Sequence, residues 1–204
     1  MIVGIYLAAG QGRRMGRNKL AMSLGNEYVG SIALKIILQS RLDFTIVVTN
    51  PSDELIWLPP SVADNGRYST FPCFDAQYGQ SYSLKFGVKK AMEIGAEAII
   101  IFLADQPFIS TKLINELISH YKKGANVNVV ASSFNHIPRP PVLFSEKSFA
   151  EILNLQGDQG ARKLIRRKKT GEQIIIEFAD CMPFIDIDNE EDFLRVRQLL
   201  DEKG

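Results

Sequence analysis

Three short apolar runs, rich in β-branched and aromatic residues, set the fold class of this 204-residue chain. They span residues 2–8, 44–49 and 98–103, and each is about the length of one strand. Runs without polar alternation are typical of strands that are buried on both faces of a parallel sheet. Helical spacing of apolar residues at 28–39 and 83–94 lies between them. This alternation of strand and helix predicts an α/β fold with a mostly parallel sheet.

The pattern continues with less regularity through the second half of the chain. Ser110 can cap a helix at 111–121, and a strand follows at 127–132. Prolines at 138, 140 and 141 then predict a rigid extended segment. Further strands are expected at 142–144, 174–178 and 184–187, and further helices at 147–155, 160–168 and 190–200. We expect a single three-layer α/β domain with a Rossmann-like sheet that binds ligands outside the carboxyl ends of its strands.

The composition excludes several classes of protein. Hydrophobic residues make up 46% of the chain and charged residues 23%, as in soluble globular domains. Since 24 Lys and Arg face 23 Asp and Glu, no global charge attracts nucleic acid or an anionic membrane. The apolar start of the chain is too short to span a bilayer, so we expect a cytoplasmic enzyme. Cys73 and Cys181 show neither metal-ligand spacing nor a disulfide framework, so we expect buried free thiols.

A basic, glycine-rich loop follows the first strand at residues 8–19. It has glycines at 10, 12 and 16 and basic residues at 13, 14, 17 and 19. Glycine lets backbone N–H groups approach phosphate oxygens while Arg and Lys supply charge, so the loop suits a polyphosphate. It is not a dinucleotide fingerprint, because its third glycine falls one residue late, nor a Walker loop, because Leu20 follows Lys19. From the residues alone, a surface turn with solvated charges is the alternative.

The loop sequence from Leu7 to Gly16, followed by Lys19, resembles the signature of the MobA-like nucleotidyltransferases. More narrowly, the chain is similar to molybdenum cofactor cytidylyltransferases and to purine-catabolism proteins that serve xanthine dehydrogenase. Five further segments match in order, at 79–84, 103–107, 141–144, 157–162 and 186–188.

This resemblance implies a fold, a reaction and a partner. The fold is that of the nucleotide-diphospho-sugar transferases, with a nucleotide-binding half over about 1–132 and an acceptor-binding half over about 133–204. The reaction joins CMP from CTP to molybdenum-molybdopterin and releases pyrophosphate. A molybdenum hydroxylase apoenzyme would be the partner, and no nucleic acid or membrane is implied.

Carboxylates at two places in the chain are candidates for binding a metal ion. Asp105 ends a buried strand just before Pro107, where a carboxylate suits Mg²⁺, with Mn²⁺ as a substitute, although it could merely cap the turn. Asp186 and Asp188 alternate with isoleucines, so in a strand both carboxylates would point to one face. The resemblance places this pair beside the nucleotide, with Asp188 as the preferred second ligand and Asp186 as the second choice. Asp188 could instead N-cap the helix that follows.

The resemblance also assigns roles to individual residues. Lys19 would stabilise charge at the α-phosphate, and Arg14 would hold the leaving phosphates. Together with Asp105, these two residues are the expected catalytic residues. Arg139 and Arg162 would contact the anionic acceptor, although a solvated surface explains them equally well. The expected nucleotide-binding residues are Leu7, Ala8, Ala9, Gly10, Gly12, Arg13, Arg14, Gly16, Lys19, Gln80, Ser81 and Ser83. For the last three, ordinary helix capping is the alternative.

Two positions bear on the choice of substrates. The guanylyl branch of the family has a second glycine in place of Ala9, so Ala9 favours cytosine. Pro140 stands where the cytidylyl pattern has a histidine, which leaves the acceptor open. The alternatives are a guanylyltransferase, a transferase that makes a sugar or small-acid nucleotide, and a noncatalytic partner that delivers cofactor to a molybdenum hydroxylase.

Overall fold

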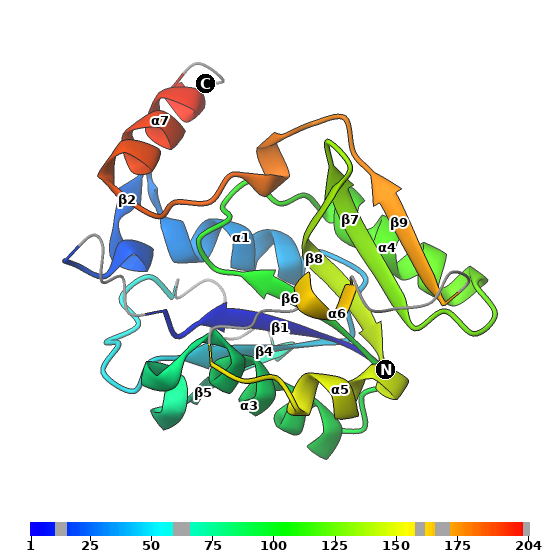
Figure 1. Ribbon diagram of the computed structural model, residues 1–204. Coiled ribbons are helices and arrows are strands. Elements are labelled where there is room, and N and C mark those ends of the chain that lie inside the picture. The colour runs from blue at the N-terminus through cyan, green and yellow to red at the C-terminus, as the bar shows by residue number, and fades with distance from the viewer. Residues whose placement is uncertain (11–15, 59–65, 158–161, 166–171, 202–204) are drawn as a thin grey trace.

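The computed structural model describes residues 1–10, 16–58, 66–157, 162–165 and 172–201 (Figure 1). Within these residues one seven-stranded sheet has the order β5-β4-β1-β6-β8-β7-β9, and β2 and β3 form a separate hairpin. The strands are β1 (Ile2–Ala8), β2 (Ser23–Leu24), β3 (Glu27–Tyr28), β4 (Phe44–Thr49), β5 (Tyr68–Pro72), β6 (Ala98–Leu103), β7 (Val129–Phe134), β8 (Ile137–Ser145) and β9 (Gln173–Glu177). The α/β fold class is as expected.

The sheet is mostly parallel, and β8 is the exception. β1 pairs in parallel with β4 and β6, β4 pairs in parallel with β5, and β7 pairs in parallel with β9. β8 runs antiparallel to both of its neighbours, β6 and β7. The carboxyl ends of β1, β4, β5 and β6 therefore meet at one edge of the sheet, and the loops that follow them are brought together there.

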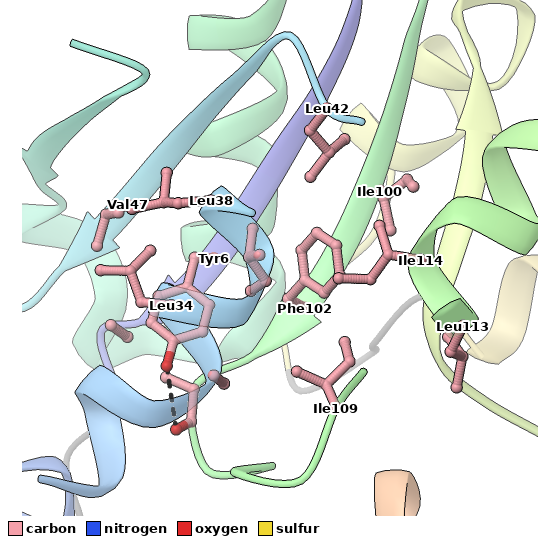
Figure 2. Packing of buried hydrophobic residues seen from close by; sticks show 14 of the residues in the cluster. Tyr6, Leu34, Leu38, Leu42, Val47, Ile100, Phe102, Ile109, Leu113 and Ile114 are labelled. Carbon is pink, nitrogen blue, oxygen red and sulfur yellow. Dashed lines mark hydrogen bonds between the residues drawn. The ribbon is translucent and has the colours of Figure 1, made fainter. Parts of the chain in front are cut away.

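Helices cover both faces of the sheet and make it the middle of three layers (Figure 1). They are α1 (Val29–Leu38), α3 (Gln80–Glu93), α4 (Thr111–Lys123), α5 (Phe149–Leu153), α6 (Arg162–Ile165) and α7 (Glu190–Asp201). Successive residues of β1 face opposite layers: Tyr6 belongs to the core cluster on the side of α1 and α4, and Ile5 belongs to the cluster on the side of α3 and α5. Figure 2 shows Tyr6 beside Leu34 of α1. In the described ranges, no helix combines the length and the apolar character needed to cross a membrane.

The strongly patterned elements lie where the sequence predicts them. β1, β4 and β6 have the expected bounds, because each is a buried run that needs no polar face. α4 begins at its predicted cap, since Ser110 Oγ accepts a hydrogen bond of 3.2 Å from Leu113 N. Its buried residues, Leu113, Ile114, Leu117 and Ile118, form one stripe against the sheet.

Residues 184–187 do not form the expected strand. Phe184 ends a 3₁₀ helix, η4 (Met182–Phe184), and residues 185–188 are irregular. Ile187 N donates to the carbonyl of Asp105 at 3.0 Å, so this segment lies against the loop after β6 rather than beside a strand. The alternation of apolar and acidic residues reflects burial on one side only, with Ile187 buried and Asp188 exposed. Within the described chain, the segment does not pair with a strand of the sheet.

The two cysteines differ, and the expectation for Cys181 is wrong. Cys73 is buried, and burial is the main cause that raises the pKa of its thiol. Cys181 is exposed because it lies in a surface turn, in which Asp180 Oδ1 accepts a hydrogen bond of 2.9 Å from Met182 N. Neither cysteine forms a disulfide.

Other elements differ from the prediction in extent. The edge strand β5 and the β2–β3 hairpin were not predicted, since neither is a continuous buried run. α3 begins at Gln80, three residues before the expected start. β8 continues back through the prolines to Ile137 instead of starting at Val142. Of the helix expected at 160–168, α6 covers Arg162–Ile165, and most of the remainder lies outside the described residues.

Candidate active site

A pocket of about 370 Å³ opens at the carboxyl edge of β1 and β6. The end of β1 and the residues after it form one side, and the 3₁₀ helix η2 (Phe74–Tyr78) and the start of α3 form another. Of the expected nucleotide-binding residues, the pocket is lined by Leu7, Ala8, Ala9, Gly10, Lys19, Gln80 and Ser83, and Asp105 lines it as well. The fold thus brings residues from three distant segments to one concave site.

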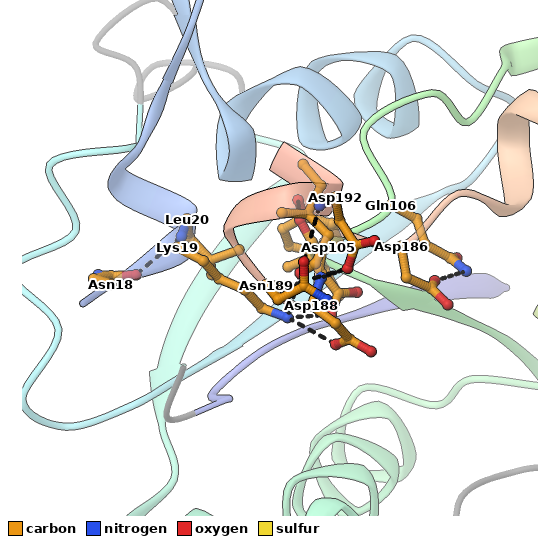
Figure 3. Close-up of polar contacts among 12 residues, drawn as sticks. Asn18, Lys19, Leu20, Asp105, Gln106, Asp186, Asp188, Asn189 and Asp192 are labelled. Atoms are coloured by element: carbon orange, nitrogen blue, oxygen red, sulfur yellow. Dashed lines mark hydrogen bonds and ion pairs between the residues drawn. The ribbon is translucent and has the colours of Figure 1, made fainter. Parts of the chain in front are cut away.

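Lys19 lies between two of the candidate metal ligands. Its Nζ is 2.5 Å from Asp105 Oδ2 and 3.6 Å from Asp188 Oδ1, and it donates to the carbonyl of Ile187 at 2.9 Å (Figure 3). The Lys19 and Asp105 side chains are only 14% and 21% exposed, so water screens this pair little, whereas Asp188 is 51% exposed. The other oxygen, Asp105 Oδ1, is buried and accepts no hydrogen bond within the described part of the chain.

Asp186 and Asp188 point to different places. Asp186 Oδ1 accepts a hydrogen bond of 2.6 Å from Nε2 of the buried Gln106, and Figure 3 shows this pair to one side of Lys19. Asp188 instead approaches the Lys19 ammonium. The two carboxylates therefore do not share one face as a strand would have placed them, and the geometry favours Asp188 over Asp186 as the partner of Asp105.

The cap of α7 is formed by other residues than Asp188. Asn189 Oδ1 accepts from Asp192 N at 2.9 Å, and Asp192 Oδ2 accepts from the backbone N–H groups of Asn189 and Asp188 at 3.2 Å and 3.0 Å. This reciprocal arrangement is a capping box with Asn189 at the N-cap. The carboxylate of Asp188 therefore does not form the helix cap, and it lies near the Lys19 ammonium instead.

Tyr6 is fully buried next to the loop that carries Asp105, and the sequence analysis did not predict a role for it. Its hydroxyl donates to the carbonyl of Gly30 at 2.8 Å and lies 3.4 Å from that of Ala104, the residue before Asp105. Burial raises the pKa of Tyr6 well above its ordinary value, and the charge of Asp105 adds to the rise. Tyr6 therefore stays a protonated donor that links α1 to the Asp105 loop.

The start of α3 presents backbone and side-chain groups to the pocket. Gly79 occupies the N-cap with φ 129°, a conformation that favours glycine, and it offers no side chain to cap the helix. Gln80 and Ser83 line the pocket, whereas Ser81 is fully buried and donates its N–H to the carbonyl of Gly157 at 3.2 Å. Capping by the side chain of the N-cap residue therefore does not explain the polar residues Gln80, Ser81 and Ser83 at the start of α3.

Several predicted residues lie elsewhere or outside the described chain. Gly12, Arg13 and Arg14 lie outside the described residues, as does the side chain of Arg162. Gly16 is exposed and has φ 63°. Arg139 is half-buried on β8, opposite Ser132 of β7, and is not among the residues that line the pocket.

The sequence places this site in a known family. Residues 4–173 match the MobA-like NTP transferase domain. The chain belongs to this family. It is a nucleotidyltransferase of the MobA-like type, and the pocket lies at the edge of the sheet where such a fold binds its ligands.

Individual relatives are similar over most of the chain. The purine catabolism protein PucB of Bacillus subtilis (strain 168) is 38% identical over 98% of this chain and 97% of its own. A molybdenum cofactor guanylyltransferase of Rhodobacter capsulatus is 31% identical over 57% of each chain. The solved structure of Rv0371c from Mycobacterium tuberculosis H37Rv has a TM-score of 0.78 at 21% identity over 97% of both chains, and that protein is also known in complex with manganese. At this identity, the structural likeness supports the fold alone.

Proposed function

We propose that this nucleotidyltransferase joins CMP from CTP to the terminal phosphate of molybdenum-molybdopterin and releases pyrophosphate. The product would serve maturation of a molybdenum hydroxylase such as xanthine dehydrogenase, in the cytoplasm. The observation that carries the transferase chemistry is the ion pair of Lys19 with Asp105 at the wall of the pocket, with Asp188 beside the same ammonium group. The acceptor is supported by similarity to a purine catabolism protein and to a molybdenum cofactor guanylyltransferase.

Asp105 and Asp188 fit the requirements of a Mg²⁺ site. Both carboxylates already approach one cationic group, and Asp105 has a buried oxygen without a hydrogen-bond partner in the described residues. No group of three or more His, Cys, Asp or Glu in the described ranges is arranged to hold a metal ion. A Mg²⁺ ion held by two carboxylates would take its remaining ligands from phosphate oxygens and water. When bound, Mg²⁺ or Mn²⁺ would neutralise charge on the triphosphate.

The protein's own groups would position the nucleotide and stabilise charge. Lys19 would turn its ammonium to the α-phosphate, and the backbone N–H groups after β1 would approach the other phosphates. Arg14, which lies outside the described residues, is proposed to hold the leaving pyrophosphate. Because the attacking group is a phosphate of the acceptor, the reaction needs no side-chain nucleophile, and in-line alignment together with charge neutralisation would supply the rate enhancement.

The acceptor is proposed to bind in the half of the chain from about 133 to 204. Arg139 supports this proposal because its Nε is buried without a partner in the described part of the chain, so a donor remains for an anion. Arg162 begins α6 and is the second proposed contact, with its side chain outside the described residues. Both guanidinium groups suit a phosphate, which accepts paired hydrogen bonds.

We expect CTP with Mg²⁺ to raise the melting temperature more than GTP or ATP does. Ala9 is buried at the pocket in place of a second glycine, and its methyl group would leave less space for the larger purine. The gain should grow with ligand concentration, because the nucleotide binds only the folded chain. Differential scanning fluorimetry with each nucleotide checks this, and equal shifts for all three would remove the preference for cytosine.

Release of pyrophosphate tests the reaction itself. We expect release from CTP only when molybdenum-loaded molybdopterin is present, because the acceptor phosphate is the attacking group. Release that requires GTP would instead identify a guanylyltransferase, the activity named for the Rhodobacter capsulatus relative. Activity with a sugar phosphate alone would reassign the acceptor. Binding of molybdopterin without release from any nucleotide would indicate a delivery protein.

A further inference from the structure

The loop that follows β4, residues 50–58, holds a carboxylate at its centre that the proposed reaction does not use. Asp53 accepts three hydrogen bonds. Its Oδ1 receives Leu55 N at 2.9 Å and Asn18 Nδ2 at 3.0 Å, and its Oδ2 receives Trp57 Nε1 at 2.9 Å. Two of these donors lie in the loop itself, whereas Asn18 lies 35 residues away, directly before Lys19. Asp53 thus joins this loop to the turn that carries the site lysine.

Asn18 uses both ends of its side-chain amide. Its Nδ2 donates to Asp53, and its Oδ1 accepts a hydrogen bond of 3.1 Å from Leu20 N. The second contact caps the 3₁₀ helix η1 (Lys19–Ala21), whose first residue is Lys19. Since the orientation of the amide is fixed by Asp53, the direction in which η1 begins is fixed by the same contact.

The far side of Asp53 is anchored in the core. Trp57 is fully buried, and its ring lies 6.3 Å from that of Tyr6, which in turn contacts the carbonyl of Ala104 beside Asp105. Leu55 has φ 55°, a conformation that is unfavourable for a branched side chain, and Asp53 Oδ1 holds its N–H in that turn. A strained turn persists only where surrounding contacts stabilise it. The hydrogen bonds that the Asp53 carboxylate accepts therefore hold the conformation of this loop.

We propose that Asp53 is the positioning residue for Lys19, and that it acts through Asn18 to aim the Lys19 ammonium at Asp105 and Asp188. The inference rests on the role of Lys19 in the proposed function. Asp53 touches no reacting group, and its contribution is to limit the orientations of η1 before substrate binds. Such preorganisation raises turnover because misplacement of a catalytic group is costly.

Asn18→Asp tests the hydrogen bond between Asn18 and Asp53. The new carboxylate keeps an oxygen to cap η1 at Leu20 N, but it puts a second oxygen where Nδ2 donates, so two negative charges face each other at Asp53. We expect the melting temperature to stay near that of the wild type, because Asn18 is exposed. Asn18→Ser is the second variant, because its hydroxyl can still cap η1 at Leu20 N but is too short to donate to Asp53 as Asn18 Nδ2 does. Ser52→Ala, in the same loop, is the matched control, because within the described chain Ser52 bonds locally to Asn50.

The first readout needs no substrate. Limited acetylation with acetic anhydride, followed by mass spectrometry, measures how well the ion pair protects Lys19, with the exposed Lys89 as internal reference. We expect Asn18→Asp to raise the labelling rate of Lys19 by about threefold or more, since the Lys19 side chain is only 14% exposed in the ion pair and becomes more accessible to the reagent when it leaves Asp105. Asn18→Ser should raise the rate as well, and Ser52→Ala should leave it unchanged.

The second readout is turnover. We expect kcat for pyrophosphate release to fall about tenfold or more in Asn18→Asp, to fall in Asn18→Ser as well, and to stay unchanged in Ser52→Ala. If the wild type releases no pyrophosphate from any nucleotide, the proposed function fails while the labelling rates still test the link between Asp53 and Lys19. Labelling of Lys19 at the wild-type rate in a folded Asn18→Asp protein, or in a folded Asn18→Ser protein, would overturn the proposal.

Discussion

Asp105→Asn should leave the fold intact and lower the rate of nucleotidyl transfer by about a thousandfold, the loss that corresponds to several kcal/mol of charge stabilisation at a metal-dependent site. The amide has the shape of the carboxylate, and the backbone hydrogen bond from Ile187 N to the carbonyl of Asp105 does not depend on the side chain. The variant lacks the charge that attracts a divalent cation. Thermal unfolding, Mn²⁺ binding and pyrophosphate release, measured on one preparation, separate these effects.

A matched substitution keeps this test specific. Asp180→Asn is the control, because Asp180 Oδ1 only accepts from Met182 N in an exposed turn, a contact that an amide oxygen can also make. We expect this variant to match the wild type in Mn²⁺ affinity and turnover. If Asp105→Asn behaved in the same way, Asp105 would be a turn residue before Pro107, and the proposed metal site would have to be abandoned.

The sequence predicted the sheet where the signal is local. β1, β4 and β6 could be read from single apolar runs, and the cap of α4 from Ser110, because each depends on neighbouring residues. The error at 184–187 has a different origin. Alternation of apolar and acidic residues shows one-sided burial, but a strand also needs a partner for its backbone, and that partner depends on distant parts of the chain.

The sequence named candidate residues of the site but not how they are arranged. Lys19, Asp105 and Asp188 were named from the sequence and the resemblance, and the fold brings them together, although their roles remain predictions. The sequence analysis considered Asp188 as the cap of α7, whereas Asn189 and Asp192 form it, and it did not predict that Asp186 would bind Gln106. Tyr6 and Asp53 gave no signal because their importance comes from contacts with residues 24 and 35 positions away.

Lys19→Met separates two effects of the same ammonium group that have opposite signs. Methionine keeps most of the apolar stem and removes the charge. Turnover should fall about a hundredfold or more, as when one donor that stabilises developing negative charge is lost. In the absence of nucleotide, Mn²⁺ should bind more tightly, because the Lys19 ammonium lies 2.5 Å from Asp105 Oδ2 and repels a second cation there. Fluorescence or electron paramagnetic resonance titration with Mn²⁺ measures the second effect.

The size of that second effect follows from simple electrostatics. Two like unit charges about 4 Å apart repel by about 1 kcal/mol even in water, so removing the ammonium should tighten Mn²⁺ binding about fivefold or more. Lys35→Met is the control, since Lys35 pairs with Glu27 Oε1 at 2.5 Å on α1, outside the pocket lining, and should change neither turnover nor Mn²⁺ affinity. Near-normal turnover in Lys19→Met would remove Lys19 from the chemistry. Weaker Mn²⁺ binding would show that the two carboxylates need the lysine to hold their places, and that they do not form a cation site on their own.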